Sequence, residues 1–290
     1  MRPFIDKFLL LVILSVTAIQ NAFAIDLQPG DVVAPKPGFS SMQVTNQYSE
    51  RNDYYLHGEK VAAYPKISSS IYALRLGHSF EVAQLPAYFY AQLPFGAVHP
   101  QGGFTSDSGL GDTSMAFALW PYANRETKTY VGLAGYLIVP TGSYDSKQVF
   151  NMGENRYKTA LQAGYDTPLT DKLAFMAAFD TVWYGDNNDA FTRTGSKKLE
   201  QDALYTGQVG LRYDFNPQYS LTGTYYYTFG GETSYDGIES NNPTRLQRYQ
   251  VSGVANYSFG RITVHYGGDI KTENGYYEDQ RLTLRYTVRF

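Results

Sequence analysis

Apolar and polar residues alternate along the chain in twelve successive segments. In the last of them, RLTLRYTVRF, apolar or aromatic residues occupy every even position and polar or cationic residues every odd position. A period of two is typical of β-strands whose two faces meet different environments. Each segment is long enough to cross a membrane as a tilted strand of about 9 to 11 residues. The segments span residues 40–49, 67–80, 84–96, 111–121, 127–139, 155–167, 171–184, 200–215, 218–230, 246–259, 261–271 and 276–290.

The connections between these segments differ in length according to their order. Those after even-numbered segments are short turns, such as the Asn-Pro pair at 216–217, whereas most of those after odd-numbered segments are long and polar, such as 140–154. Outer-membrane barrels combine short periplasmic turns with longer external loops. The pattern predicts an all-β protein in which residues 40–290 form a twelve-stranded antiparallel transmembrane β-barrel, an up-and-down meander with both termini at the periplasmic end.

The alternation assigns one face of each strand to lipid and the other to the lumen. The outward positions are apolar or aromatic, and the chain contains 27 Tyr and 17 Phe, residue types that suit membrane interfaces. Charged residues, Asp202 among them, fall on the inward positions; a charge on the lipid face costs about 2 to 4 kcal/mol. A soluble, lipocalin-like barrel with an apolar interior is the alternative. The net charge of -3, without a basic run, gives no indication of nucleic-acid binding.

The N-terminus indicates export. Residues 1–24 combine a charged start, the apolar run FLLLVILSV and a final AFA, which together predict a signal peptide cleaved before Ile25. A retained transmembrane helix is the alternative, but the apolar run is about half the length that a spanning helix needs. The Pro- and Gly-rich residues 25–39 do not predict a regular element. They form either a plug inside the lumen or a flexible periplasmic tail.

Barrel size and lining predict a restricted path. About eight strands fill a lumen with side chains and about sixteen leave a wide aqueous pore, so twelve strands predict a narrow or plugged channel. Opposed rows of charge favour small polar solutes, whereas stacked rings favour aromatic ones. The arginines of the last strand are expected to pair with Asp269 and, if the N-terminal segment enters the barrel, with Asp31. The channel-lining candidates are Tyr88, Tyr90, Asp112, Tyr136, Asp166, Asp180, Arg212, Tyr226, Arg248, His265, Asp269, Arg281, Arg285 and Arg289.

An enzyme embedded in the membrane, of the lipase or protease type, is the alternative function. The chain has no cysteine and four histidines, of which His265 has a serine, Ser252, placed to approach it from the neighbouring strand. A site that opens into the lumen would not reach lipid, so His265 is interpreted as part of a polar network. The histidine spacing predicts no metal site, and no cofactor is expected. A structural barrel with a closed lumen is the third alternative.

The last strand carries Tyr286, Val288 and Phe290 on its apolar face. This ending resembles the assembly signal of Gram-negative outer-membrane proteins. The resemblance implies that the barrel-assembly machinery recognises these side chains and inserts the chain into the cell outer membrane. Outer-membrane lipid and lipopolysaccharide are then the expected surroundings of the barrel.

Three stretches of the sequence resemble one family of outer-membrane proteins. They are LQPGDVVAPKPG at 27–38, GLGDTSMAFALW at 109–120 and VPTGSYD at 139–145. In order and spacing they resemble the family named for the meta-pathway of phenol degradation, although Thr113 stands where proline is common in that family. The resemblance implies a twelve-stranded, monomeric, non-enzymatic channel for the passive uptake of small, hydrophobic or aromatic molecules.

Overall fold

The computed structural model describes residues 26–62, 64–192 and 194–290. The predicted signal peptide, 1–24, lies outside the described residues. Twelve long strands lie near their predicted positions, and several of them extend further than predicted. They are β1 (Ser40–Leu56), β3 (Ile67–Val82), β4 (Leu85–Pro100), β6 (Thr113–Asn124), β7 (Thr129–Val139), β8 (Lys158–Pro168), β9 (Leu173–Tyr184), β12 (Leu204–Asp214), β13 (Tyr219–Gly230), β16 (Thr244–Tyr257), β17 (Gly260–Thr272) and β18 (Gly275–Arg289).

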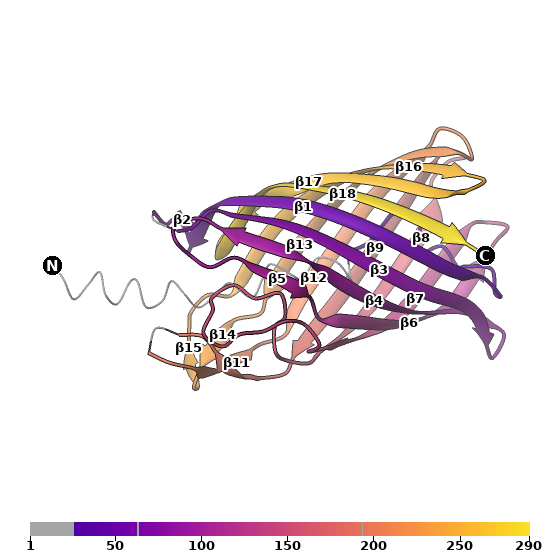
Figure 1. Cartoon of the computed structure of the whole chain (residues 1–290). Helices are drawn as coiled ribbons and strands as arrows, with labels where there is room; N and C mark the ends of the chain where they lie inside the picture. Colours follow the sequence, from indigo (N-terminus) through magenta and orange to yellow (C-terminus); the bar gives the residue numbers. More distant parts are fainter. Residues whose placement is uncertain (1–25, 63, 193) are drawn as a thin grey trace.

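Each of these strands pairs in antiparallel fashion with the next one, and β18 pairs with β1 to close the sheet. The closing register runs from Ser41 opposite Arg289 to Tyr55 opposite Gly275. The structure confirms the predicted twelve-stranded antiparallel barrel, whose tilted strands are seen side by side in Figure 1. Closure leaves no free sheet edge, as a span through lipid requires. Among the described residues there is no helix that could cross a membrane.

Short turns join the strands at the end of the barrel that carries the C-terminus, the predicted periplasmic end, and the long connections gather at the other end (Figure 1). In the turn Ala83–Gln84 both residues have positive φ, 50° and 67°, as a two-residue hairpin between twisted strands requires. The long connections contain the short strands β2 (Glu59–Lys60), β5 (Asp107–Leu110), β10 (Asn187–Ala190), β11 (Lys197–Gln201), β14 (Thr233–Tyr235) and β15 (Ile238–Glu239). The last four form a separate external sheet.

The predicted segment 200–215 joins two different elements. β11 ends at Gln201 and pairs with β14 in the external sheet, whereas the barrel strand β12 begins at Leu204. Asp202 lies between them and is exposed, so it does not face the lumen from a barrel strand, and that prediction is wrong. The break at Asp202 and Ala203 contains no Gly or Pro, so the sequence carries no turn signal that marks it.

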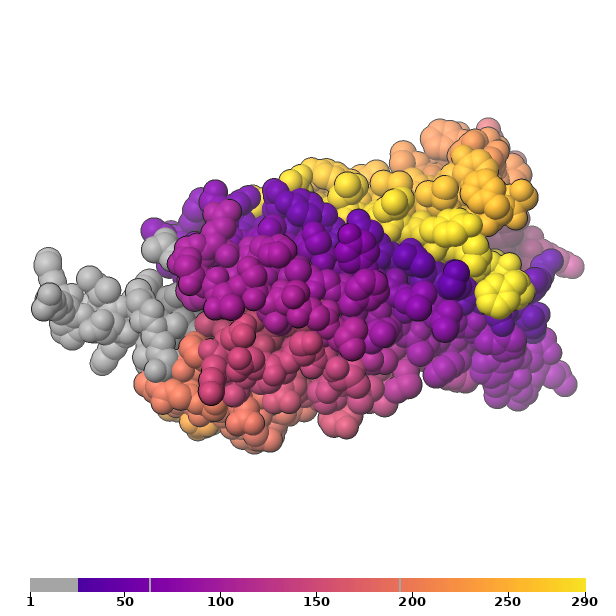
Figure 2. Space-filling view, viewed as in Figure 1, coloured from indigo at the N-terminus to yellow at the C-terminus, as the bar shows by residue number. Residues whose placement is uncertain are grey.

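The two faces of the barrel wall differ as the alternation predicts. On β18, Leu282 and Leu284 are each 50% exposed on the outer face, whereas Arg281 and Arg285 are each 8% exposed on the inner face. Figure 2 shows the closed outer surface where this C-terminal strand, in yellow, meets the indigo N-terminal strand. A β-bulge in β6, between Leu119 and Tyr122, contains the inward-facing Trp120.

Two irregular segments occupy the interior. Residues 26–39, the N-terminal segment, enter at the periplasmic end, next to the start of β1. The connection 140–157, the inward loop, folds into the external mouth, where Phe150 and Met152 are buried against apolar side chains of β3 and β4. Irregular chain segments therefore enter the lumen of this barrel from both ends.

Candidate functional site

The N-terminal segment is bound to the lumen wall at its innermost described residue, Asp26. Its carboxylate forms ion pairs with Arg248 of β16 (Oδ1–Nη2, 2.6 Å) and with Arg281 of β18 (Oδ2–Nη1, 3.3 Å). All three side chains are 10% exposed, so water screens the charges weakly. Each charge therefore depends on its partner, because an unpaired charge inside protein is strongly destabilising.

Backbone groups of the segment also bond to the wall. Leu27 N donates a hydrogen bond to Gln208 Oε1 at 2.7 Å, and Tyr226 Oη donates to Leu27 O at 3.2 Å. Arg261 donates to Pro29 O. These partners satisfy an irregular backbone at membrane depth, where only protein or lumen water can do so.

The middle of the segment packs against the opposite wall. Trp120 Nε1 of β6 donates to Val32 O at 2.6 Å. Leu27, Val32 and Ala34 are buried with Trp120 in one apolar cluster. Gly164 of β8 permits this approach, because a Cβ there would lie 2.8 Å from Val32 Cγ2.

The periplasmic end of the segment is fixed as well. Arg125, in the turn between β6 and β7, donates to Pro35 O at 2.9 Å. Ser79 Oγ donates to Lys36 O at 2.7 Å and accepts from Phe39 N at 3.0 Å. The segment is therefore bound along its length, from the periplasmic end to the level of the Asp26 ion pairs.

Space remains on one side of the segment. A cavity of about 110 Å³, the tyrosine cavity, lies between it and strands β3, β4, β6, β7 and β8. Tyr88, Tyr90 and Tyr136, three of the predicted lining residues, face this cavity together with Arg75. The Arg75 guanidinium lies 4.0 Å from the centre of the Tyr90 ring in a cation–π contact. The structure thus brings three predicted aromatic residues together.

Asp166, Asp180 and Arg212 form bonds elsewhere in the lumen. Arg212 Nη1 lies 2.9 Å from Asp166 Oδ2, in an ion pair toward the periplasmic end of the wall. Gln208 Nε2 donates to Asp180 Oδ2 at 2.6 Å. Gln208 is the same amide that accepts from Leu27 N, so Asp180 supports a side chain that holds the N-terminal segment.

The partners of Arg281 differ from the prediction. Arg281 pairs with Asp26 and, through Nη2, with Glu278 Oε2 at 2.7 Å, and not with Asp269. Glu278 lies three residues away on the same strand and takes the position expected for Asp269. Asp269 accepts a hydrogen bond from Glu278 N at 2.8 Å instead. It therefore supports the acidic partner of Arg281.

Asp31 of the N-terminal segment lies among arginines of the wall. Its carboxylate lies in the field of the positive charges of Arg285, Arg75 and Arg261. Arg285 thus acts on Asp31 through its charge, and a direct ion pair between them stays a prediction. Arg289 is exposed at the periplasmic rim, where its charge acts on Arg261.

His265 and Ser252 are in contact, as the alternative hypothesis of an embedded enzyme requires. His265 Nδ1 lies 2.7 Å from Ser252 Oγ, but the two residues are 2% and 0% exposed. Within the described chain, His265 Nε2 has no hydrogen-bond partner, so no carboxylate orients the ring. A catalytic pair needs an orienting group and access to substrate. The described residues also contain no group of three or more His, Asp or Glu side chains that could hold a metal ion.

Asp112 lies at the external mouth, where it anchors the inward loop. One carboxylate oxygen accepts from Gly142 N and the other from Glu154 N, both at 2.9 Å. Asp112 therefore stabilises the inward loop. It is a predicted lining residue, but it does not border the tyrosine cavity.

Glu154 is the centre of a buried charge cluster in the inward loop. Its carboxylate contacts Lys158 Nζ at 2.6 Å and Arg156 Nη2 at 2.9 Å, and none of the three side chains is more than 6% exposed. The Arg156 guanidinium also lies 4.5 Å from the centre of the Tyr184 ring. Burial acts to raise the pKa of Glu154, but the charges of Lys158 and Arg156 outweigh it and lower the pKa below its usual value.

Three residues that organise the interior are absent from the sequence-based candidates: Asp26, Trp120 and Glu154. Trp120 has a usable signal, because it occupies an inward position in the alternation of segment 111–121. Asp26 and Glu154 lie in stretches without periodicity, and nothing in the sequence pattern distinguishes them from solvated acidic residues.

The family model described as "Putative MetA-pathway of phenol degradation" matches residues 56–286. The chain belongs to this family. The resemblance carried by the three sequence motifs is thereby confirmed. No curated protein sequence matches the chain.

Solved structures include a similar protein that matches this family member along almost its whole length. It is an outer membrane channel from Pseudomonas putida F1, with 32% sequence identity, a TM-score of 0.86, and a match that covers 91% of this chain and 100% of that chain. The translocator domain of the autotransporter NalP from Neisseria meningitidis is more distant, with 10% identity, a TM-score of 0.49, and coverage of 87% and 89%. A mutant of the monoaromatic hydrocarbon channel TodX has 10% identity, a TM-score of 0.49, and coverage of 88% and 90%. This family member is an outer-membrane β-barrel of a Gram-negative bacterium.

The C-terminal residue gives a prediction about assembly. We expect Phe290→Ala to slow membrane insertion by the barrel-assembly machinery, because Phe290 is 73% exposed at the end of β18 and supports no packing inside the barrel. Phe259→Ala is the matched control, since Phe259 is also exposed at the periplasmic end, at 60%, but lies in a turn. Insertion into proteoliposomes that contain the machinery, followed as protection from protease, measures both rates. Equal rates for the two variants would contradict the signal role of Phe290.

Proposed function

We propose that this protein is an outer-membrane channel for the passive uptake of small, hydrophobic or aromatic molecules. The observation that carries the proposal is the cavity of about 110 Å³ inside a closed barrel, with Tyr88, Tyr90, Tyr136 and Trp120 on its walls. Aromatic walls favour a flat ring, which stacks on tyrosine and tryptophan. Similarity to the Pseudomonas putida F1 channel supports the passage of a solute.

In this proposal, residues 26–39 are a plug and residues 40–290 are the channel. The ion pairs of Asp26 and the bond from Trp120 support that role, because they hold the segment across the periplasmic half of the lumen. Arg248, Arg281 and Tyr226 then serve as anchors, and the three tyrosines of the cavity contact the solute. The barrel closes within one chain, which supports a monomer as the functional unit.

A pair of matched solutes tests the substrate class. We expect proteoliposomes that contain the full-length mature protein to take up benzoate several-fold faster than cyclohexanecarboxylate. The two molecules share size and charge, but only benzoate has a ring that stacks on tyrosine. Both are anions at neutral pH, so leakage through the lipid is slow. Uptake of the labelled solutes, corrected for protein-free liposomes, is the measurement.

Two results would contradict different parts of the proposal. Equal uptake of both solutes would remove the aromatic preference and leave the channel. No uptake above protein-free liposomes, for either solute and also after deletion of residues 26–37, would contradict the channel itself. Hydrolysis of lipid or peptide substrates that Ser252→Ala abolishes would support the enzyme alternative instead.

A further inference from the structure

The inner residues of the N-terminal segment, Asp26 to Pro29, form their hydrogen bonds and ion pairs to the wall on one side of the lumen. The wall residues that bond to its inner part come from strands β12 to β18 and are Gln208, Tyr226, Arg248, Gln250, Arg261 and Arg281. On the other side, from β3 to β8, small residues lie opposite the segment. Ala118, Gly132, Ala134 and Gly164 line the tyrosine cavity there. The free space in the lumen is therefore eccentric, between the segment and strands β3 to β8.

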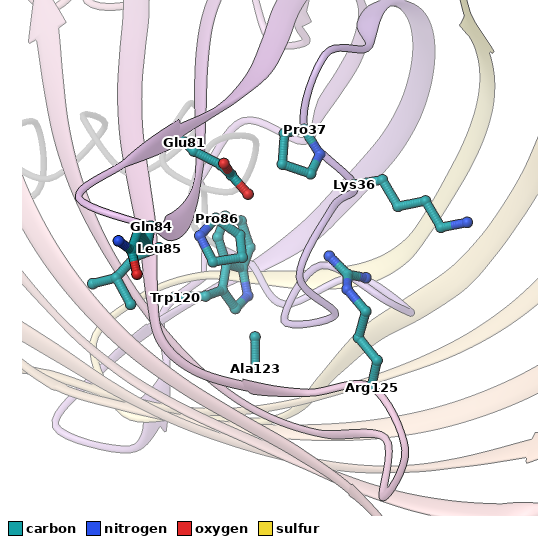
Figure 3. A pocket seen from close by; sticks show the side chains of 9 residues that line it. All are labelled: Lys36, Pro37, Glu81, Gln84, Leu85, Pro86, Trp120, Ala123 and Arg125. Carbon is teal, nitrogen blue, oxygen red and sulfur yellow. The ribbon is translucent and has the colours of Figure 1, made fainter.

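A second cavity lies on the periplasmic side. It has a volume of about 490 Å³ and is bordered by Lys36 and Pro37 of the N-terminal segment and by the turn between β3 and β4. Ala123 of β6 and Arg125 of the turn that follows border its other side (Figure 3). We name it the periplasmic cavity.

One side chain borders both cavities, and it is Trp120. The indole is 5% exposed and is held by the hydrogen bond from Nε1 to Val32 O at 2.6 Å. Figure 3 shows the ring among the side chains that line the periplasmic cavity. Trp120 thus lies where the eccentric space passes from mid-lumen to the periplasmic side.

We propose that the Trp120 side chain is the gate between the two cavities, and that a solute passes it while the N-terminal segment stays bound. This inference rests on the proposed channel function and names its route. Moving the indole breaks one hydrogen bond and one set of apolar contacts. Extracting the segment breaks the two ion pairs of Asp26 and every bond to strands β12 to β18. The side-chain movement is therefore the smaller change.

Substitution of the gate gives the first test. We expect Trp120→Ala, in the full-length mature protein, to raise benzoate uptake several-fold, and Trp120→Phe to give an intermediate rate because it keeps a ring but loses the Nε1 donor. Tyr130→Ala is the matched control, because Tyr130 belongs to the same buried cluster but borders neither cavity. Its uptake should equal that of the unmodified protein.

Locking the segment gives the second test. The chain has no cysteine, and Gln250 Nε2 lies 3.4 Å from Gln28 Oε1, so Gln28→Cys with Gln250→Cys can be joined by a short bismaleimide. The proposal predicts that uptake continues after cross-linking, and that Trp120→Ala still raises it. Loss of uptake on cross-linking, or an unchanged rate in Trp120→Ala, would overturn the gate. If one of these results overturns the gate while deletion of residues 26–37 still opens a pore, the proposed channel function stands without a gate at Trp120.

Discussion

Deleting residues 26–37 should turn the barrel into an open pore with a conductance at least several-fold higher than that of the full-length mature protein. The deletion removes the ion pairs of Asp26, the apolar contact of Val32 with Trp120, and the chain that fills the periplasmic half of the lumen. A lumen of twelve strands lies between the filled barrels of about eight and the open pores of about sixteen. Planar-bilayer recording of purified, folded protein measures the change.

The barrel itself should survive this deletion. Every long strand keeps both neighbours. Gly38 and Phe39, which precede β1, remain in place and keep their hydrogen bonds to Ser79 of β3. Arg248 and Arg281 lose Asp26, but water in the open lumen solvates their charges, and Arg281 keeps its ion pair with Glu278. A Gly-Ser segment of the same length in place of 26–37 is the control for bulk alone, and it should give an intermediate, fluctuating current. An unchanged current after deletion would mean that the inward loop closes the pore without the N-terminal segment.

The wall of this protein is predictable because lipid and lumen impose opposite polarity on alternate residues. Leu282 and Leu284 cannot face a polar interior with their neighbours Arg281 and Arg285 in lipid, so a shift by one residue would reverse every side chain of β18. Twelve strands follow from the same argument, and the parity of connection lengths sets which end is periplasmic. The facing of Tyr88, Tyr90 and Tyr136 follows as well.

The contents of the lumen are not predictable in this way. Asp26 and Arg248 are 222 residues apart in sequence, and their contact exists only because the barrel closes around an irregular segment that has no period of its own. The same reason hides Glu154, whose burial depends on a loop that folds inward. The predicted pairing of Arg281 with Asp269 is wrong for a related reason. Alternation tells that Asp269 faces the lumen, but it does not tell which of several inward acidic residues lies nearest to Arg281.

Removing the charge of Glu154 should release the inward loop from the external mouth. In Glu154→Gln, the buried Arg156 and Lys158 lose the carboxylate that they share. Breaking a buried ion pair by removing one partner destabilises by about 3 to 5 kcal/mol. That free energy is enough to open the loop locally while the strands stay paired. We expect faster hydrogen exchange across 140–157 and more frequent open events in bilayer recordings.

Acidification should have the same effect as the substitution, and the sign follows from the pKa of Glu154. Its pKa is lowered in the folded loop, with burial opposing and Lys158 and Arg156 prevailing. The ionised carboxylate therefore stabilises the loop above the unfolded pKa, and this stabilisation is lost as the pH falls through the folded pKa. Glu200→Gln is the matched control, because Glu200 pairs with Lys198 in the open, at 38% and 41% exposure, and should change little. If Glu154→Gln and Glu200→Gln exchanged equally across 140–157, the buried cluster would not be what holds the loop inside the mouth.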